Sequence, residues 1–307
     1  MRCSFTDDQR LFAQALREML AKECPPSLVR GVWDDGSGHA PELWTKLGEM
    51  GVLGLLADAP MADAILLFQE LGRAAVPGPV VEHAAVVVPA LTAMPEYAGL
   101  LDGTLVATAA GFDGSPYVAH AAVADLVLTP EGIRTGFDAV DVDGIDGGRR
   151  IATISGGELS PLPAEFDRDA AFDRGALAMA AYLIGLGERM IDIAAEYARQ
   201  REQFGKPIGS FQAVKHLMSD ALLQVEFAKP PTYFGSVSLA PHEISMAKAL
   251  ASEAAYRASR SSMQVHGGIG YTWEADLQLW MKKAWALMRA WGDASWHRRR
   301  VGTHVLG

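Results

Sequence analysis

Two segments of the chain combine a charged or amide side chain with aromatic residues and glycines. They are RQREQFGKPIGSFQAVKH at 199–216 and QVHGGIGYTWE at 264–274. Arginine offers a planar fork of donors that matches phosphate oxygens. Glycines let backbone N–H groups come close to an anion, and an aromatic side chain can pack on a ring system. Either segment alone is only suggestive, but both are predicted to lie at helix ends, and their combination is specific.

The same residues also have a plainer interpretation. Arg201 can be a solvated charge at the C-terminus of a helix, where the helix dipole favours a cation. Gly267 and Gly268 can simply form the C-cap of the preceding helix. His266, in VHGG, is expected to cap or pack rather than to catalyse.

A third stretch, ALMRAWGDASWHRRR at 286–300, contains a single carboxylate, Asp293. Trp291 has no group that accepts a proton at neutral pH, so it cannot serve as a general base. Trp291 lies 11 residues after Trp280, which is close to three helical turns, so the two side chains are predicted to share a packing face. The arginines at 298–300 are expected to complement a helix C-terminus, the alternative being contact with a ligand phosphate.

The elements that position these residues begin with helices over residues 1–100. Thr6 and Gln9 form a predicted capping box at the start of the first helix. A second helix is predicted within 41–56, ending near the glycines at 51 and 54, and a third within 61–79, stopped by Gly72, Pro77 and Pro79.

Residues 101–163 change to short β-rich runs separated by turn sequences, which predicts a small β domain. Residues 164–307 return to helical periodicity, with an apolar stripe over 172–199.

Four antiparallel helices with short loops are predicted for this last part, which would make a four-helix bundle. Ser210 is the expected cap of its second helix, and Pro230 and Pro231 are expected to end that helix. The third helix is predicted over 240–270 and the fourth over 274–291.

Composition narrows the classes of function. The 307 residues are 50% hydrophobic and carry a net charge of −10, which does not favour a nucleic-acid surface. Cys3 and Cys24 are the only cysteines and form no metal-binding motif, so neither a disulfide framework nor a metal site is expected. With no uncharged apolar run of about 18 residues, we expect a cytoplasmic protein without a membrane partner.

The order of helical domain, small β domain and helical bundle, together with REQFGKPIGSFQAVKH and QVHGGIGYT, resembles the acyl-CoA dehydrogenase family. The resemblance covers nearly the whole chain and is strongest over 165–285. It implies FAD as cofactor and oxidation of an acyl-CoA thioester at its α and β carbons. It also implies electron-transfer flavoprotein as a possible electron acceptor.

In the family, the residues of the two motifs reach across a subunit interface to the adenosine and pyrophosphate half of the neighbour's FAD. The resemblance therefore implies cofactor contacts for a set of residues at the matching positions. These are Arg201, Gln203, Phe204, Ile208, Phe211, Gln264, Gly267 and Gly268.

The chain departs from the family where the catalytic carboxylate is expected. The usual position is Trp291, followed by the family's glycine at Gly292, and Asp293 has the wrong reach to replace it. Some members carry the base on the first bundle helix, where this chain has Gly175 after the pair Phe172 and Asp173. The sequence thus predicts no catalytic residue at either position.

The β domain also lacks the family's loop that holds the flavin ring and has only AAGFDGSPYVAHA in its place. Residues that serve a neighbour's FAD remain, whereas those that serve the chain's own are absent. This pattern resembles the smaller subunits of α2β2 acyl-CoA dehydrogenases of bacterial steroid and cholesterol catabolism. It implies a full-length catalytic partner subunit, a shared FAD and a bulky acyl-CoA substrate.

Two rival hypotheses stay open at the level of sequence. One is a self-sufficient homomeric flavoenzyme that uses Asp293 or another carboxylate as its base. The other is a structural or binding protein that contacts no flavin in any complex.

Overall fold

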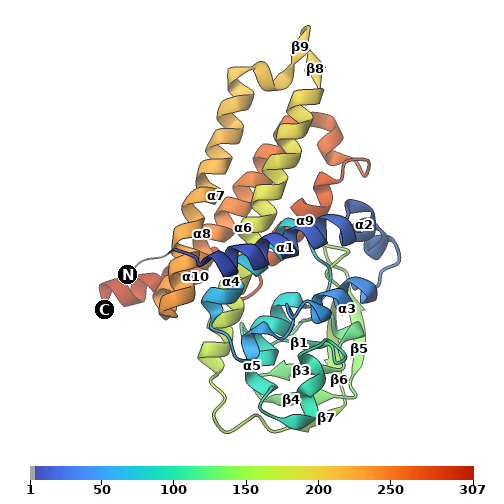
Figure 1. Ribbon diagram of the computed structural model, residues 1–307, viewed down its shortest axis with the longest axis vertical. Helices are drawn as coiled ribbons and strands as arrows, with labels where there is room; N and C mark the ends of the chain where they lie inside the picture. The colour runs from blue at the N-terminus through green and yellow to red at the C-terminus, as the bar shows by residue number, and fades with distance from the viewer. Residues whose placement is uncertain (1–3) are drawn as a thin grey trace.

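Helix α6 (Arg168–Gln200) is the longest element and runs through the molecule, as the computed structural model, which describes residues 4–307, shows (Figure 1). The fold is mostly helical, with N-terminal helices, a small β region and a C-terminal helical bundle, as the sequence predicts. Cys3 lies outside the described residues, and Cys24 is a buried free thiol.

The N-terminal part begins with α1 (Asp7–Glu23), and the predicted capping box is present at its start. Thr6 Oγ1 accepts from the Gln9 amide at 3.2 Å, and Gln9 Oε1 accepts from the Thr6 amide at 2.8 Å. The remaining helices of this part are α2 (Pro26–Asp34), α3 (Pro41–Glu49), α4 (Met61–Arg73), a π-helical segment (Glu82–Val87) and α5 (Val88–Leu91). The second predicted helix, expected to end near the glycines at 51 and 54, ends at Glu49, and the chain turns at Gly51 with a φ of 78°.

The β region has two small sheets. The first has the order β1-β3-β4-β7, and β1 and β3 are parallel. The second has the order β2-β6-β5 and is antiparallel. The strands are β1 (Ala107–Ala109), β2 (Val118–Ala119), β3 (Leu126–Thr129), β4 (Gly132–Thr135), β5 (Asp138–Val142), β6 (Ile151–Ser155) and β7 (Glu158–Ser160).

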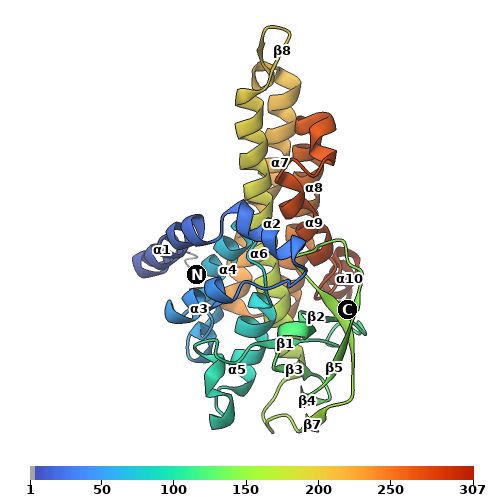
Figure 2. The same ribbon diagram turned by 90° about the vertical axis from the view of Figure 1, so that its right-hand side faces the viewer.

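The bundle contains α6, α7 (Gln212–Ser238), α8 (Pro241–His266) and α9 (Leu277–Leu287), and α10 (Ala294–Leu306) packs on α8 (Figure 2). The prediction that Pro230 and Pro231 end the second helix is wrong, because α7 continues through both. The apolar stripe of α7 continues past the prolines at Thr232 and Gly235, both buried, so packing outweighs the cost of the prolines. Leu239 ends α7 in a left-handed conformation.

Two further expectations for the bundle are corrected. Ser210 lies in a 3-10 turn (Ile208–Ser210), and the residue before α7 is Phe211, whose side chain provides no cap. The fourth helix ends at Leu287, and Trp291 follows in a turn with a φ of 58°. Trp280 and Trp291 therefore do not share a helix face.

Close contact between α4 and α6 depends on two glycines. A Cβ at Gly72 would collide with the carbonyl oxygen of Tyr182, and a Cβ at Gly185 would collide with that of Gln69. Backbone atoms cannot move aside as a flexible side chain can, so both positions require glycine. This contact joins the N-terminal helices and the bundle into one hydrophobic core.

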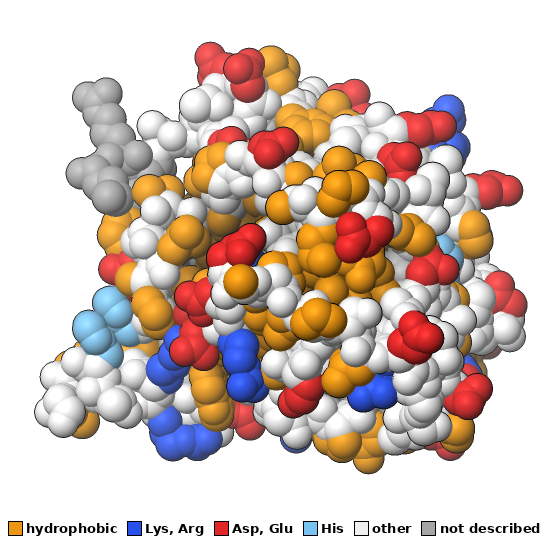
Figure 3. Space-filling view, turned by 90° about the horizontal axis from the view of Figure 1, so that it is seen from below, with side chains coloured by type: hydrophobic (Ala, Val, Ile, Leu, Met, Phe, Trp, Pro, Cys, Tyr) orange, Lys and Arg blue, Asp and Glu red, His pale blue; other side chains and the backbone are white. Residues whose placement is uncertain are grey.

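The outer face at the β end carries scattered hydrophobic side chains among acidic and basic ones (Figure 3). Across residues 4–307, none of the helices combines the length and apolar character needed to cross a membrane.

The α4–α6 contact predicts that Gly185→Ala lowers the free energy of unfolding by about 2 kcal/mol or more, because the added methyl meets backbone on α4. Gly302→Ala is the matched control on α10, where an added Cβ meets nothing within 4 Å and alanine should add up to about 1 kcal/mol. Urea denaturation of the three chains measures both effects. A Gly185→Ala protein as stable as the parent would contradict the proposed packing.

Candidate functional site

The two motifs found in the sequence meet at one end of the bundle, drawn at the top of Figure 1. Tyr197, near the end of α6, stacks on His266 at the end of α8, with ring centroids 4.4 Å apart. Ile208 packs against a small cluster that contains Val265 and Ala198. His266 Nδ1 lies 2.8 Å from Ser262 O, and burial lowers its pKa, so this histidine packs at the junction.

The first motif forms a tight hairpin beyond α6. Strands β8 (Glu202–Gln203) and β9 (Lys206–Pro207) are antiparallel, and Phe204 and Gly205 between them have φ values of 54° and 74°. Two positive φ values in a two-residue loop match the twist of a hairpin. The Phe204 side chain is 91% exposed and its ring lies edge-on to Phe211 at 6.1 Å.

The predicted polar and glycine positions are accessible at this end. Arg201, Gln203, Gln264, Gly267 and Gly268 are all exposed. Gly267, with a φ of 63°, caps α8, and its N–H donates to Met263 O. An added Cβ at Gly267 or Gly268 would meet nothing within 4 Å, so no part of the chain covers the backbone of this turn.

At the other end of the bundle, the two positions at which the resemblance places a base touch each other. Gly175 lies on α6 and Trp291 on the turn between α9 and α10, and a Cβ at Gly175 would be 2.6 Å from Trp291 Cε3. The Trp291 side chain is buried and its ring lies over that of Phe112 at 5.9 Å and 28°. Phe172 adds a tilted contact at 6.1 Å.

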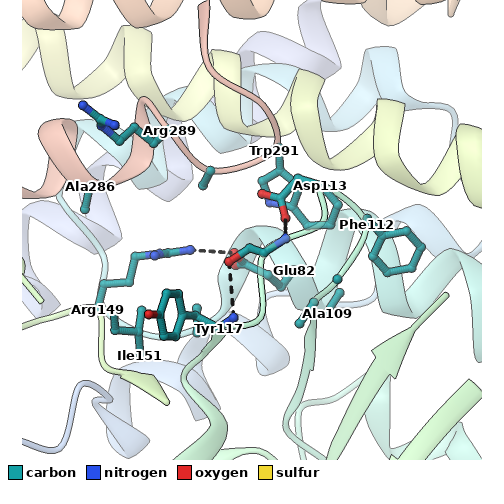
Figure 4. Close-up of a pocket in the computed structure, with 15 residues that line it drawn as sticks. Glu82, Ala109, Phe112, Asp113, Tyr117, Arg149, Ile151, Ala286, Arg289 and Trp291 are labelled. Atoms are coloured by element: carbon teal, nitrogen blue, oxygen red, sulfur yellow. Dashed lines mark hydrogen bonds and ion pairs between the residues drawn. The ribbon is translucent and has the colours of Figure 1, made fainter. Parts of the chain in front are cut away.

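A cavity of about 200 Å³ remains beside Trp291, between the β region and the end of α9 (Figure 4). It opens into a second hollow of about 530 Å³, with which it shares Tyr117, Arg149, Ile151, Ala286 and Arg289. Its lining residues are Glu82, Ala109, Ala110, Gly111, Phe112, Asp113, Ser115, Tyr117, Ala119, Arg149, Ile151, Ala286, Arg289, Ala290 and Trp291.

The turn that carries Trp291 is held by Lys248, a fully buried lysine on α8. Its Nζ lies 3.0 Å from Gly292 O, 3.3 Å from Met288 O and 3.1 Å from Ser252 Oγ. It therefore satisfies carbonyl oxygens at the end of α9 that have no helical partner. Burial lowers the pKa of Lys248 to about 7.

His297 on α10 fixes the same turn from the other side. Its Nε2 lies 2.8 Å from Trp291 O and its Nδ1 3.0 Å from Ser245 Oγ. Burial, and then the charge of Lys248, lower the pKa of His297 to about 4. The ring is therefore neutral near pH 7, and because a carbonyl can only accept, its proton sits on Nε2.

The two carboxylates closest in sequence to Trp291 and Gly175 are engaged within the chain. Asp293 is the N-cap of α10, with Oδ1 2.8 Å from the Trp296 amide, and this hydrogen bond lowers its pKa. Asp173 is buried and paired with Arg300, and burial raises its pKa. These contacts assign both carboxylates to capping and packing.

The expectation for the three arginines at 298–300 is corrected. They lie inside α10, which continues to Leu306, rather than at a helix C-terminus. Arg298 pairs with Glu253 and Arg300 with Asp173, so the dipole is not what stabilises them.

Sequence reasoning missed Lys248, His297 and Phe112. A lysine in a helix is usually exposed, and nothing around Lys248 in the sequence indicates burial. One signal in the sequence could have shown that the fourth helix ends before Trp291. In Trp-Gly-Asp at 291–293, Asp293 is a good N-cap for a new helix.

Comparison with known proteins identifies the family. Residues 6–95 match the acyl-CoA dehydrogenase N-terminal domain, and residues 168–306 match its C-terminal domain. The chain is 32% identical to acyl-CoA dehydrogenase IpdE2 of Mycobacterium tuberculosis, with 91% of both chains covered. The chain belongs to the acyl-CoA dehydrogenase family. It is also 30% identical to IpdE2 of Mycolicibacterium smegmatis, with 98% of this chain and all of the relative covered.

Solved structures share the fold at lower identity. The ChsE4-ChsE5 complex from Mycobacterium tuberculosis has a chain with a TM-score of 0.87 and 22% identity, covering 100% of this chain and 99% of that one. The Tcur3481-Tcur3483 steroid acyl-CoA dehydrogenase variant has a TM-score of 0.85 and 20% identity, with 98% of each chain covered. Membership of the family supports FAD as the cofactor of this kind of enzyme, and a glutaryl-CoA dehydrogenase from Mycobacterium smegmatis that shares the fold was solved in complex with FADH2.

Lys248 predicts a pH dependence of stability. Its pKa is about 7 in the folded chain and near 10.5 when unfolded, so between pH 7 and 9 the unfolded chain binds more protons there. The free energy of unfolding should therefore rise with pH, by about 1 kcal/mol per unit from this group. Lys248→Met should lose that slope, which urea denaturation at pH 7, 8 and 9 measures. Parallel pH profiles for the two proteins would show that Lys248 is not buried as described.

Proposed function

We propose that this chain is the smaller subunit of a heteromeric FAD-dependent acyl-CoA dehydrogenase that introduces an α,β double bond into a bulky acyl-CoA thioester. One observation carries the proposal. Both base positions, Trp291 and Gly175, lack a carboxylate and are packed against each other, whereas the residues matching the family's cross-subunit FAD contacts are exposed.

The bundle end suits the adenosine and pyrophosphate half of an FAD held mainly by a partner. Arg201 is exposed and offers donors to a diphosphate, and the uncovered Gly267–Gly268 backbone lets an anion approach. Gln203 and Gln264 add amide donors, and Phe204 and Phe211 provide aromatic surface for an adenine ring. Ile208 packs beneath, where it fixes the hairpin.

The Trp291 end does not suit a flavin ring of the chain's own. The cavity there is about 200 Å³, and Phe112 lies on the Trp291 ring. We therefore place the FAD in the site of a full-length catalytic subunit, within an α2β2 assembly. When bound, FAD supplies the hydride acceptor for desaturation, and a carboxylate of the partner is the base in this proposal.

A steroid-derived thioester is the substrate class that we favour. The support is the likeness to a chain of a steroid acyl-CoA dehydrogenase and to the ChsE4-ChsE5 complex. A subunit without a substrate site of its own leaves volume for a polycyclic substrate in the neighbouring site. Electron-transfer flavoprotein is the proposed electron acceptor, and we place the complex in the cytoplasm.

The two rivals are separable from this proposal. A homomeric enzyme would have to use a carboxylate, and Asp293 and Asp173 are engaged in a helix cap and an ion pair. Of the two carboxylates that line the cavity beside Trp291, Asp113 accepts from the Ser115 amide and Glu82 faces Arg149 at 4.0 Å. A purely structural protein would leave the exposed motif without a ligand.

The first prediction concerns flavin stoichiometry. Expressed alone, the chain should purify without flavin absorbance, because in this proposal the partner subunit holds the flavin ring. Expressed with a full-length acyl-CoA dehydrogenase encoded beside it, it should give a yellow complex with one FAD per pair of chains. Absorbance at the flavin bands against chain mass measures this. One FAD per chain, or a yellow lone chain, would support the homomeric rival.

The second prediction concerns Arg201. In the co-expressed complex, Arg201→Ala should weaken FAD retention by about tenfold or more, because one charge-assisted hydrogen bond to a phosphate is lost. Arg199→Ala is the matched control, since Arg199 is also exposed at the same end of α6. Flavin release during dialysis compares the two. Equal retention in both variants would argue against contact between Arg201 and FAD.

A further inference from the structure

Helix α1 crosses the middle of the molecule in Figure 1, and a pocket lies between its C-terminal half and helices α4, α6 and α9. We call it the α1 pocket. It measures about 350 Å³, within the range of about 300–1,000 Å³ that small-molecule sites usually have. None of its lining residues belongs to the two motifs or to the two hollows beside Trp291. They are Arg17, Leu20, Ala21, Cys24, Pro25, Pro26, Glu70, Arg73, Ala74, Arg189 and Trp280.

The floor of the α1 pocket is apolar. Leu20, Cys24 and Trp280 are at most 5% exposed there. The polar atoms among them are already used, because Trp280 Nε1 donates to Arg73 O at 2.9 Å and Cys24 Sγ donates to Ala74 O at 3.5 Å. Burial raises the pKa of the Cys24 thiol to about 12, so it stays neutral. The floor therefore offers a ligand apolar surface, on which an alkyl chain is favourably buried.

Three guanidinium groups line the pocket, and two of them are balanced by carboxylates. Arg17 donates to both oxygens of the buried Glu70, at 2.7 Å from Nε and 2.6 Å from Nη2. Arg73 donates from Nη2 to Asp192. In charge-assisted pairs of this kind each cation has its counter-ion at hand. Arg17 and Arg73 therefore add little net charge to the pocket.

Arg189 is the cation of the pocket that remains unbalanced. Its Cζ lies 5.7 Å from the centroid of the Trp280 ring, a cation–π contact that holds the guanidinium over the floor. The only carboxylate within 4 Å of it among residues 4–307 is that of Glu196, which is exposed and lies 3.8 Å from Nη1, beyond hydrogen-bond distance. A solvent-exposed pair at this separation contributes little. Arg189 therefore keeps hydrogen-bond donors for a ligand.

An apolar floor beside one unbalanced guanidinium selects a ligand with an alkyl body and a single negative charge. A carboxylate fits the planar fork of one arginine with two parallel hydrogen bonds. We propose that the α1 pocket binds an aliphatic carboxylate, with its head on Arg189 and its chain across Leu20 and Trp280. The site uses no motif residue and needs no partner chain, so it stands or falls independently of the shared FAD.

Isothermal titration of the full chain with three probes tests the proposal. Octanoate carries both the chain and the charge, octanol carries the chain alone, and acetate carries the charge alone. Octanoate should bind with a Kd of about 1 mM or tighter. Octanol and acetate should each bind about tenfold more weakly or worse, because each lacks one half of the contact.

Arg189→Met should weaken octanoate binding by about tenfold or more and leave octanol binding unchanged, since only the contact to the charged head is lost. Arg199→Met is the matched control, because Arg199 lies on the same helix, is exposed and does not line the pocket.

If Arg189→Met does not fold, Ala21→Glu provides the test, because Ala21 lines the pocket and is exposed. The new carboxylate should compete with octanoate for Arg189 or repel it, and so weaken its binding several-fold. Ala21→Gln has nearly the same shape without the charge, and octanoate should bind it more tightly than it binds Ala21→Glu.

Three outcomes would overturn the proposal. One is that octanoate shows no binding at concentrations up to about 10 mM, far weaker than a specific site of this size. Another is that octanol binds as tightly as octanoate, which would leave Arg189 no part in recognition. The third is equal loss of octanoate binding in Arg189→Met and Arg199→Met, or equal binding by Ala21→Glu and Ala21→Gln. Either result would place octanoate elsewhere on the chain.

Discussion

The architecture depends on the backbone contact between α4 and α6. At Gly72 and Gly185 the two helices approach so closely that no side chain fits between them. This fixes the N-terminal helices on a rod of 33 residues, which is roughly 50 Å long. Gly175 lies near one end of the rod and Arg201 just beyond the other, so one rigid helix sets the distance between the two regions.

The two ends of α6 have opposite character. At the Gly175 end, Trp291, Phe112 and Phe172 form a continuous aromatic packing, and burying one such ring contributes about 1.5–3 kcal/mol. Opening a substrate site there would lose that contribution and would break the hydrogen bonds from Lys248 to the Met288 and Gly292 carbonyls. At the Arg201 end, the residues proposed to contact a cofactor, such as Arg201 and Gln264, are exposed to solvent. Stability is concentrated at one end, and the capacity to bind is concentrated at the other.

The sequence predicts the parts of this structure that local patterns encode. The capping box at Thr6, the helices with strong apolar periodicity and the glycine turn at Gly267 follow from spacing alone. The second half of α7 does not, because the packing of Thr232 and Gly235 on neighbouring helices outweighs the local effect of two prolines. Lys248 could not be foreseen, since its burial comes from the distant turn at Gly292. That Gly175 and Trp291, the two positions at which the resemblance places a base, touch each other is a property of the fold that the sequence did not predict.

The prolines of α7 also have a dynamic consequence. Without N–H groups at Pro230 and Pro231, the carbonyls of Glu226 and Phe227 have no helical donor, although Thr232 Oγ1 bonds to Ala228 O at 2.8 Å. The backbone hydrogen bonds of α7 are therefore fewest at the prolines, although the helix continues through them without a break. The proline pair is therefore the point at which α7 bends most easily, and burial of Thr232, Gly235 and Ser236 beyond it keeps the second half of the helix in place.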